Sequence, residues 1–136
     1  MSERIAVKDL GREPFRVFFP VAVTAGITGV SLWPLYFGKV MQAYPGQSHA
    51  RIMAYGLFGG FIFGFLGTAM PRMLSAPALG MRNVLLLLAL HIAMVVAFVF
   101  QKMLLGDSLF LALLLSFVTL MALRLPRRKD TPPPGF

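Results

Sequence analysis

The chain has 136 residues, of which 57% are hydrophobic and only 13% are charged. In soluble domains about a quarter of all residues are charged, so this composition predicts a membrane protein and excludes an ordinary soluble domain. The sequence contains no cysteine, which excludes disulfides, thiolate metal sites, iron–sulfur clusters and cysteine catalysis.

Four apolar segments are candidates for crossing a bilayer. They are Val17–Phe37, Ile52–Met70, Val84–Phe100 and Leu109–Leu123. A hydrocarbon core of about 30 Å needs about 20 helical residues, so the fourth segment is short for a span. We predict an all-α, polytopic membrane protein with four transmembrane helices. A polar lead-in occupies residues 1–16, the membrane domain residues 17–123, and a basic, proline-rich tail residues 124–136.

The net charge of +8 is concentrated in three regions of the chain. Of the 13 basic residues, 10 precede the first span, flank the turn between the second and third spans, or follow the fourth. On a four-span topology these regions share one side of the membrane, and the positive-inside rule predicts that both termini are cytoplasmic. The basic charge therefore sets the topology, and we expect the lipid bilayer, not nucleic acid, as the partner.

Polar residues in the spans and turns give local predictions. Ser48 is a candidate N-cap for the second span, and Gly106–Ser108 is typical of a tight turn into the fourth. A row of hydroxyls lies along one stripe of the first span, at Thr24, Thr28 and Ser31. We favour bonds from these hydroxyls to carbonyls of the preceding turn over contacts between helices.

A stripe of glycines runs along the second span. Gly56, Gly60, Gly64 and Gly67 recur at spacings of four, four and three, which places them on one helix face. His49 precedes Gly56 by seven positions and therefore lies on the same face, at the helix mouth. The stripe predicts a smooth groove where a helix backbone or a flat ligand can approach closely.

The two histidines are the side chains best suited to binding haem iron or copper. We name His49 and His91 as candidate metal ligands, and His49, Met53, Gly56 and Gly60 as candidate cofactor-binding residues. The alternatives are a histidine bonded to a carbonyl or hydroxyl, and a methionine that only packs. On the four-span topology the depths of His49 and His91 differ by roughly 20 Å, so the two cannot serve one metal within one chain.

Two stretches resemble the NnrS family. Pro14–Phe19, PFRVFF, is similar to the entry motif PFRPFF of that family. His49–Met53, followed by GFLGTAMPR at Gly64–Arg72, is similar to its segment HAHEM…GFLLTAVP. The resemblance covers about residues 13–73, and beyond it only the hydropathy agrees. It implies a bacterial inner-membrane, multi-pass protein linked to haem, copper, nitric oxide and denitrification, with His49 as a haem or copper ligand.

The chain departs from this pattern in two ways. Arg51 and Ile52 replace the second histidine and the glutamate of HAHEM. On an ideal helix Arg51 points about 160° away from His49, so losing the second histidine does not disable the first. The family usually has about a dozen spans, so this chain is a fragment, half of a split protein, or a short relative that oligomerises. We expect further membrane helices on another chain or a homo-oligomer as partners.

The sequence therefore predicts an NnrS-like membrane protein that binds haem and/or copper. The spans contain no Asp, Glu, Lys or Arg and the chain shows no catalytic set, so we do not predict an enzyme. Two alternatives remain open. One is a cofactor-free membrane subunit that packs with partner helices through its glycine stripe. The other is a small oligomeric transporter with a pore lined by the hydroxyls of the first span.

Overall fold

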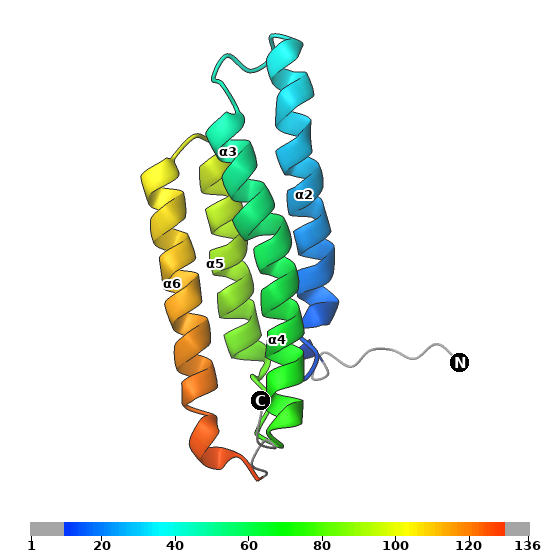
Figure 1. Ribbon diagram of the computed structural model, residues 1–136, viewed down its shortest axis with the longest axis vertical. Helices are drawn as coiled ribbons and strands as arrows, with labels where there is room; N and C mark the ends of the chain where they lie inside the picture. Colours follow the sequence, from blue (N-terminus) through cyan, green and yellow to red (C-terminus); the bar gives the residue numbers. More distant parts are fainter. Residues whose placement is uncertain (1–9, 130–136) are drawn as a thin grey trace, which may run out of the picture.

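A computed structural model describes residues 10–129, which form an antiparallel bundle of long helices (Figure 1). Residues 1–9 of the predicted lead-in and residues 130–136 of the predicted tail lie outside the described residues. In chain order the elements are α2 (Phe15–Phe37), α3 (Gly46–Arg51), the π-helical η1 (Ile52–Phe58), α4 (Gly59–Met73), α5 (Met81–Val99), α6 (Met103–Ala122) and the 3-10 turn η2 (Leu125–Arg127). No strand occurs within residues 10–129.

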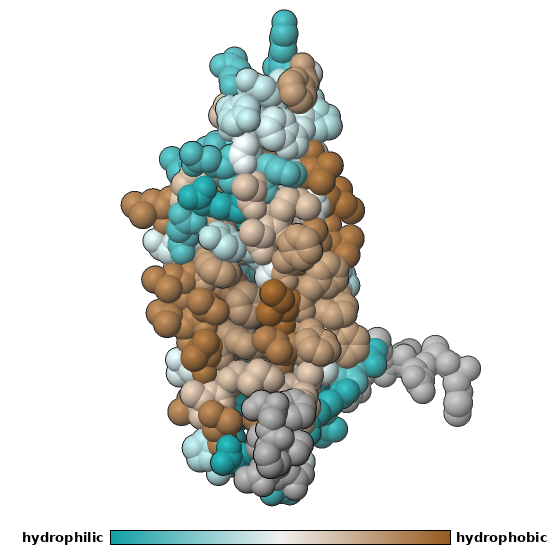
Figure 2. All heavy atoms as spheres, viewed as in Figure 1, coloured by the Kyte–Doolittle hydropathy of each residue, from teal (hydrophilic) through white to brown (hydrophobic). Residues whose placement is uncertain are grey.

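All four predicted spans are present. Four helical segments are long and apolar enough to cross a membrane, and the second is the continuous run α3–η1–α4 from Gly46 to Met73. Between the ends of the bundle large apolar side chains cover much of the visible surface (Figure 2). Ile27, Phe65 and Leu115, for example, remain 63%, 60% and 57% exposed. A surface of this kind fits contact with lipid tails.

The fourth span is longer than predicted, because α6 begins at Met103 and has 20 residues. The predicted turn at Gly106–Ser108 is therefore wrong, since these residues are helical. The chain turns instead around Gln101, whose φ is 61°. From its place in α6 the Asp107 carboxylate pairs with Arg51 of α3, with Nε–Oδ1 and Nη2–Oδ2 distances of 2.9 and 3.3 Å.

Ser48 is also not the predicted N-cap. The helix begins at Gly46, and the fully buried Ser48 hydroxyl donates to the Phe98 carbonyl at 2.6 Å. That carbonyl lies at the end of α5 and also accepts from the Gln101 N–H at 3.1 Å, so Ser48 adds a second hydrogen bond that ties α3 to α5. The hydroxyls of the first span bond as expected. Thr24, Thr28 and Ser31 donate to carbonyls four residues earlier, at 2.9, 2.8 and 2.7 Å.

The two ends of the bundle differ in chemistry. At what we call the aromatic end, Trp33, Tyr36 and Tyr44 pack together, with ring centroids 5.6 Å apart for Trp33–Tyr44 and 5.8 Å for Tyr36–Tyr44. At the opposite basic end, the first described residues, the α4–α5 loop and the end of α6 converge (Figure 1). Arg124 ties this end together by donating to the carbonyls of Pro77, Ala78 and Leu79. That the basic end is cytoplasmic stays a prediction of the positive-inside rule.

The glycine stripe packs against α2. A Cβ placed on Gly60 would lie 2.7 Å from the Ala22 Cβ, and one on Gly64 would lie 2.8 Å from the Phe18 Cβ. Gly56 meets Ala25 and Gly67 meets Pro14 in the same register. We call this line of contacts the glycine seam, made by Gly56, Gly60, Gly64 and Gly67 against Pro14, Phe18, Ala22 and Ala25. It brings the two helices together backbone to backbone.

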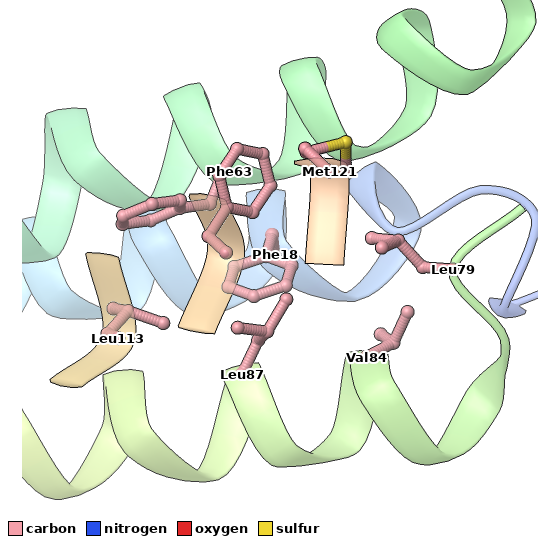
Figure 3. Packing of buried hydrophobic residues seen from close by; sticks show 8 residues of the cluster. Phe18, Phe63, Leu79, Val84, Leu87, Leu113 and Met121 are labelled. Atoms are coloured by element: carbon pink, nitrogen blue, oxygen red, sulfur yellow. The ribbon is translucent and has the colours of Figure 1, made fainter. Parts of the chain in front are cut away.

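The buried apolar side chains form two clusters. The first lies toward the basic end (Figure 3) and contains Phe18, Phe63, Leu79, Val84, Leu87, Leu113, Phe117 and Met121. The second lies toward the aromatic end and contains Ala25, Leu32, Ile52, Met94 and Phe98. On α5, Leu87 belongs to the first cluster and Met94 to the second, and His91 lies between them.

The seam yields a matched pair of variants. Gly60→Ala is expected to lower the free energy of unfolding relative to Gly59→Ala by about 1–3 kcal/mol, because the added methyl group meets the rigid Ala22. At Gly59 the nearest atom to an added Cβ is 3.7 Å away, so the same change is tolerated. The gain in helix propensity, about 1 kcal/mol, is common to both variants and cancels. Thermal unfolding in detergent, followed by Trp33 fluorescence, measures the difference, and equal stabilities would contradict the seam.

Candidate functional site

His49 lies in the first helical turn after the α2–α3 loop, half-buried at the aromatic end. Its Nδ1 is 2.9 Å from the carbonyl oxygen of Gly29 on α2, and its ring meets Trp33 edge-on at 5.8 Å. Gly29 permits this contact because it has no side chain. A Cβ there would lie 3.0 Å from Ile52 Cγ2 and 3.3 Å from the Met53 sulfur. The alternative that His49 bonds a carbonyl is therefore observed, while metal ligation by His49 stays a prediction.

The bond to Gly29 sets the tautomer of His49. A carbonyl oxygen only accepts, so Nδ1 carries the hydrogen and Nε2 of the neutral ring carries the lone pair. Within residues 10–129, Nε2 makes no hydrogen bond. Metal-ligating histidines commonly donate their second ring N–H to a backbone carbonyl in this way. The arrangement therefore suits Nε2 as a metal ligand.

Met53, Gly56 and Gly60 are occupied by packing within the chain. The Met53 sulfur rests beside Gly29, Gly56 faces Ala25 and Val95, and Gly60 faces Ala22 and His91. A flat ligand on this face would have to displace α2. A role of Met53, Gly56 and Gly60 in cofactor binding therefore stays a prediction. The same packing means that a separate partner subunit would have to use another surface than the glycine stripe.

His91 is completely buried in the middle of α5, where its ring meets Phe18 edge-on at 5.8 Å. Its Cε1 lies 3.2 Å from the position of a Cβ on Gly60. The Gly56 carbonyl faces the ring, but neither Nδ1 nor Nε2 makes a hydrogen bond to any described residue. The Gly56 carbonyl is therefore the candidate partner of His91, although it lies outside hydrogen-bond geometry. An unsatisfied buried polar group of this kind calls for an explanation.

The two histidines occupy separate places. His49 lies in the turn before Ile52. His91 contacts Gly60, which is 11 residues after His49 along one continuous helix, or about 16 Å away. Among residues 10–129 no three His, Cys, Asp or Glu side chains are close enough to hold a metal ion together. A metal in this chain alone would therefore rest on a single imidazole.

The π-helical η1, Ile52–Phe58, lies between the two histidines. Its wider turn carries Tyr55, which stacks on Phe110 of α6 with centroids 4.1 Å apart and planes 12° apart. On the seam side η1 presents Gly56 to α2 and α5. Irregular π-helical turns within α-helices often occur at functional sites. The sequence carries no pattern that would have predicted this one.

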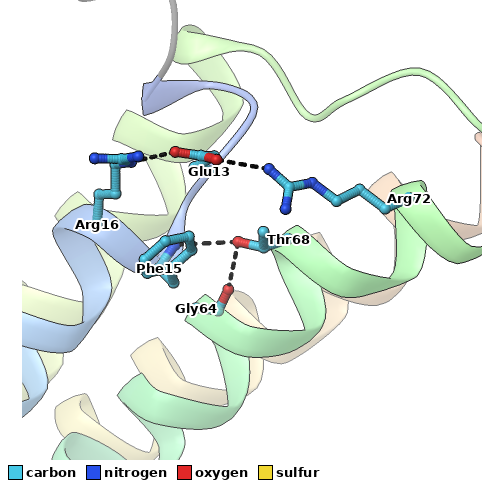
Figure 4. A network of polar contacts seen from close by, with 6 residues as sticks. All are labelled: Glu13, Phe15, Arg16, Gly64, Thr68 and Arg72. Carbon is cyan, nitrogen blue, oxygen red and sulfur yellow. Dashed lines mark hydrogen bonds and ion pairs between the residues drawn. The ribbon is translucent and has the colours of Figure 1, made fainter. Parts of the chain in front are cut away.

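The first stretch that resembles an NnrS motif, Pro14–Phe19, lies against the Gly64–Arg72 part of the second stretch at the basic end (Figure 4). The Phe15 N–H donates to Thr68 Oγ1 at 3.2 Å, and that hydroxyl donates to the Gly64 carbonyl at 2.9 Å. The Glu13 carboxylate pairs with Arg16 and, at 2.7 Å, with Arg72. Sequence reasoning missed this polar latch, made by Glu13, Arg16, Thr68 and Arg72. These residues lie in or beside the two motif stretches, but no pattern in the sequence indicates that the stretches meet.

Arg51, which stands where the second family histidine is expected, faces away from His49. It pairs with Asp107 of α6, whereas His49 bonds α2. The predicted opposition of positions 49 and 51 is confirmed. The substitution to arginine thus leaves the surroundings of His49 unaffected and ties α3 to α6.

These features define a polytopic α-helical membrane protein with one partly exposed, oriented imidazole at its aromatic end. The chain matches the family described as NnrS protein over residues 9–132, and it belongs to that family. The match extends well beyond residues 13–73, so the expectation that only hydropathy agrees after residue 73 was wrong. No curated protein and no solved structure matches the chain.

The latch predicts a dependence of stability on acid. The neighbouring Arg16 and then Arg72 guanidinium groups hold the pKa of the Glu13 carboxyl below its ordinary value of 4.5. Because the pKa is lower in the folded state, ionised Glu13 adds stability above pH 4.5. This contribution is lost as the pH falls through the folded-state pKa. Melting temperatures from about pH 7 to about pH 3 should fall less for Glu13→Gln than for the wild type. An identical acid response in both proteins would contradict the latch.

His91 offers a second test. His91→Leu is expected to leave the free energy of unfolding unchanged or to raise it by up to about 1–3 kcal/mol, because two unsatisfied nitrogens leave the core. Met94→Leu on the same helix is the control for an apolar exchange and should cost less than about 1.5 kcal/mol. A clear loss of stability in His91→Leu alone would show that the imidazole makes a hydrogen bond that stabilises the fold.

Proposed function

We propose that this NnrS-family protein binds haem and/or copper through His49 Nε2 and takes part in the nitric oxide response of a bacterial inner membrane. The observation that carries the proposal is the hydrogen bond of 2.9 Å between His49 Nδ1 and the Gly29 carbonyl. It orients the ring and leaves Nε2 with a lone pair in a half-buried position. Membership in the NnrS family supports the link to nitric oxide.

The side chains available as metal ligands favour haem over copper. Haem iron accepts a single axial histidine from the protein, whereas copper sites need several ligands close together. His49 offers one imidazole, and within residues 10–129 no cluster of metal-binding side chains surrounds it. A copper site would therefore need ligands from a second copy or from another chain. Bound haem or copper would supply the atom that binds nitric oxide, and this chain would hold the ligand imidazole in place.

Spectra and metal content of the detergent-purified protein test the proposal. We expect a haem absorption band, or stoichiometric copper, in the wild type and its loss in His49→Ala. His91→Leu is the matched control, because it removes the other imidazole and leaves His49 in place. Retention of full cofactor in His49→Ala would exclude His49 as the ligand. Loss in His91→Leu alone would move the site to the bundle core.

A further inference from the structure

A second feature, independent of His49, lies at the basic end. An open groove of about 420 Å³ runs between the start of α2 and the end of α4. Its walls include Phe15, Phe19, Phe65 and Ala69. Arg72 and Met73 line the part of the groove nearest the basic end of the bundle. From Arg72 to Phe65 the groove follows seven residues of α4, or about 10 Å. The groove therefore leads from the basic end of the bundle to the apolar surface between the two ends.

The groove is apolar inside and cationic at its mouth. Thr68 also lines it, but the Thr68 hydroxyl is already satisfied, since it accepts from the Phe15 N–H and donates to the Gly64 carbonyl. Arg72 uses one of its five N–H donors on Glu13, and its side chain is 60% exposed. The groove thus suits an occupant with an apolar body and an anionic head.

The surrounding charge also favours an anion. Between residues 10 and 129, the basic end carries eight cationic side chains and one carboxylate, that of Glu13. The cations are Arg12, Arg16, Arg72, Arg82, Arg124, Arg127, Arg128 and Lys129. Glu13 is already paired with two of these cations, so the basic end keeps a large excess of positive charge. Clusters of basic residues beside a transmembrane helix attract anionic lipids.

We propose that this groove binds one anionic phospholipid, with its phosphate at Arg72 and an acyl chain along Phe15, Phe19 and Phe65. The guanidinium fork suits a phosphate because it presents several donors in one plane. The phenylalanine side chains supply an apolar wall where the lipid tails lie. The bound lipid would cover the junction between Pro14–Phe19 and Gly64–Arg72.

Native mass spectrometry of the detergent-purified protein, titrated with phosphatidylglycerol or phosphatidylcholine, tests the proposal. We expect the wild type to retain phosphatidylglycerol in preference to phosphatidylcholine. Arg72→Gln should weaken binding of phosphatidylglycerol by about tenfold, the effect of losing a hydrogen bond to a charged group. Ala69→Phe, which fills the groove and leaves every charge in place, should weaken binding of both lipids. This variant tests the groove independently if Arg72→Gln does not fold.

Two variants separate a specific site from general effects. Arg82→Gln removes a cation from the same end outside the groove and should leave binding unchanged. Glu13→Gln breaks the latch but frees Arg72, so binding should stay equal or become tighter. Loss of binding in Arg82→Gln equal to that in Arg72→Gln would overturn the proposal in favour of diffuse charge. If Glu13→Gln lost as much phosphatidylglycerol binding as Arg72→Gln, Arg72 would act only through the latch, and the proposal would be overturned as well.

The lipid titration also distinguishes a phospholipid from a simple anion. Inorganic phosphate at matched concentration should not displace phosphatidylglycerol, because it cannot occupy the phenylalanine wall. Displacement by phosphate, equal retention of the two lipids, or full binding by Ala69→Phe would each overturn the proposal. None of these outcomes depends on haem or copper, so the lipid groove and the His49 site can fail separately.

Discussion

The close approach of α2 to the second helical segment is the constraint on which the rest of the structure depends. Gly60 and Gly64 permit it, since a methyl group at either position would collide with Ala22 or Phe18. In a lipid environment such close backbone packing replaces the hydrophobic driving force available in water. One end of the same contact delivers the Gly29 carbonyl to His49, and the other end delivers Thr68 to the start of α2. The candidate metal ligand and the polar latch are therefore two consequences of one helix–helix contact.

Most polar groups in the apolar band are satisfied, as a bilayer requires. The hydroxyls of Thr24 and Thr28 bond their own helix, and Ser48 bonds the end of a neighbour. Among the described residues, Gln101 Nε2 at the α5–α6 turn and both ring nitrogens of His91 are buried without a partner, and His91 is the one in the middle of a span. It lies between the two apolar clusters, beside the π-helical turn. An unsatisfied imidazole next to an irregular turn marks this level of the bundle as different from an ordinary packed core.

Ion pairs hold the two ends of the bundle. Arg51 joins α3 to α6 through Asp107, and Arg72 joins α4 to the entry of α2 through Glu13. Both pairs are partly exposed, so each contributes orientation more than stability. At position 51 the arginine takes a structural role, whereas the NnrS motif has a histidine there. Because positions 49 and 51 face different neighbours, this exchange alters how α3 is anchored without touching the hydrogen bond that orients His49.

The number of spans, their membrane character, the glycine face and the family were all readable from the sequence. These properties are carried by local quantities: the length of an apolar run, the spacing of small residues and two short motifs. The helical state of Gly106–Ser108, the buried bond of Ser48, the unpartnered nitrogens of His91 and the latch of Glu13 were not readable. Each depends on which group a second helix presents at that depth, as the Asp107 carboxylate does for Arg51 and the backbone carbonyl of Phe98 for Ser48. Spacing along one helix places a residue on a face, but its hydrogen-bond partner is chosen by the neighbouring helix, and only packing establishes that neighbour.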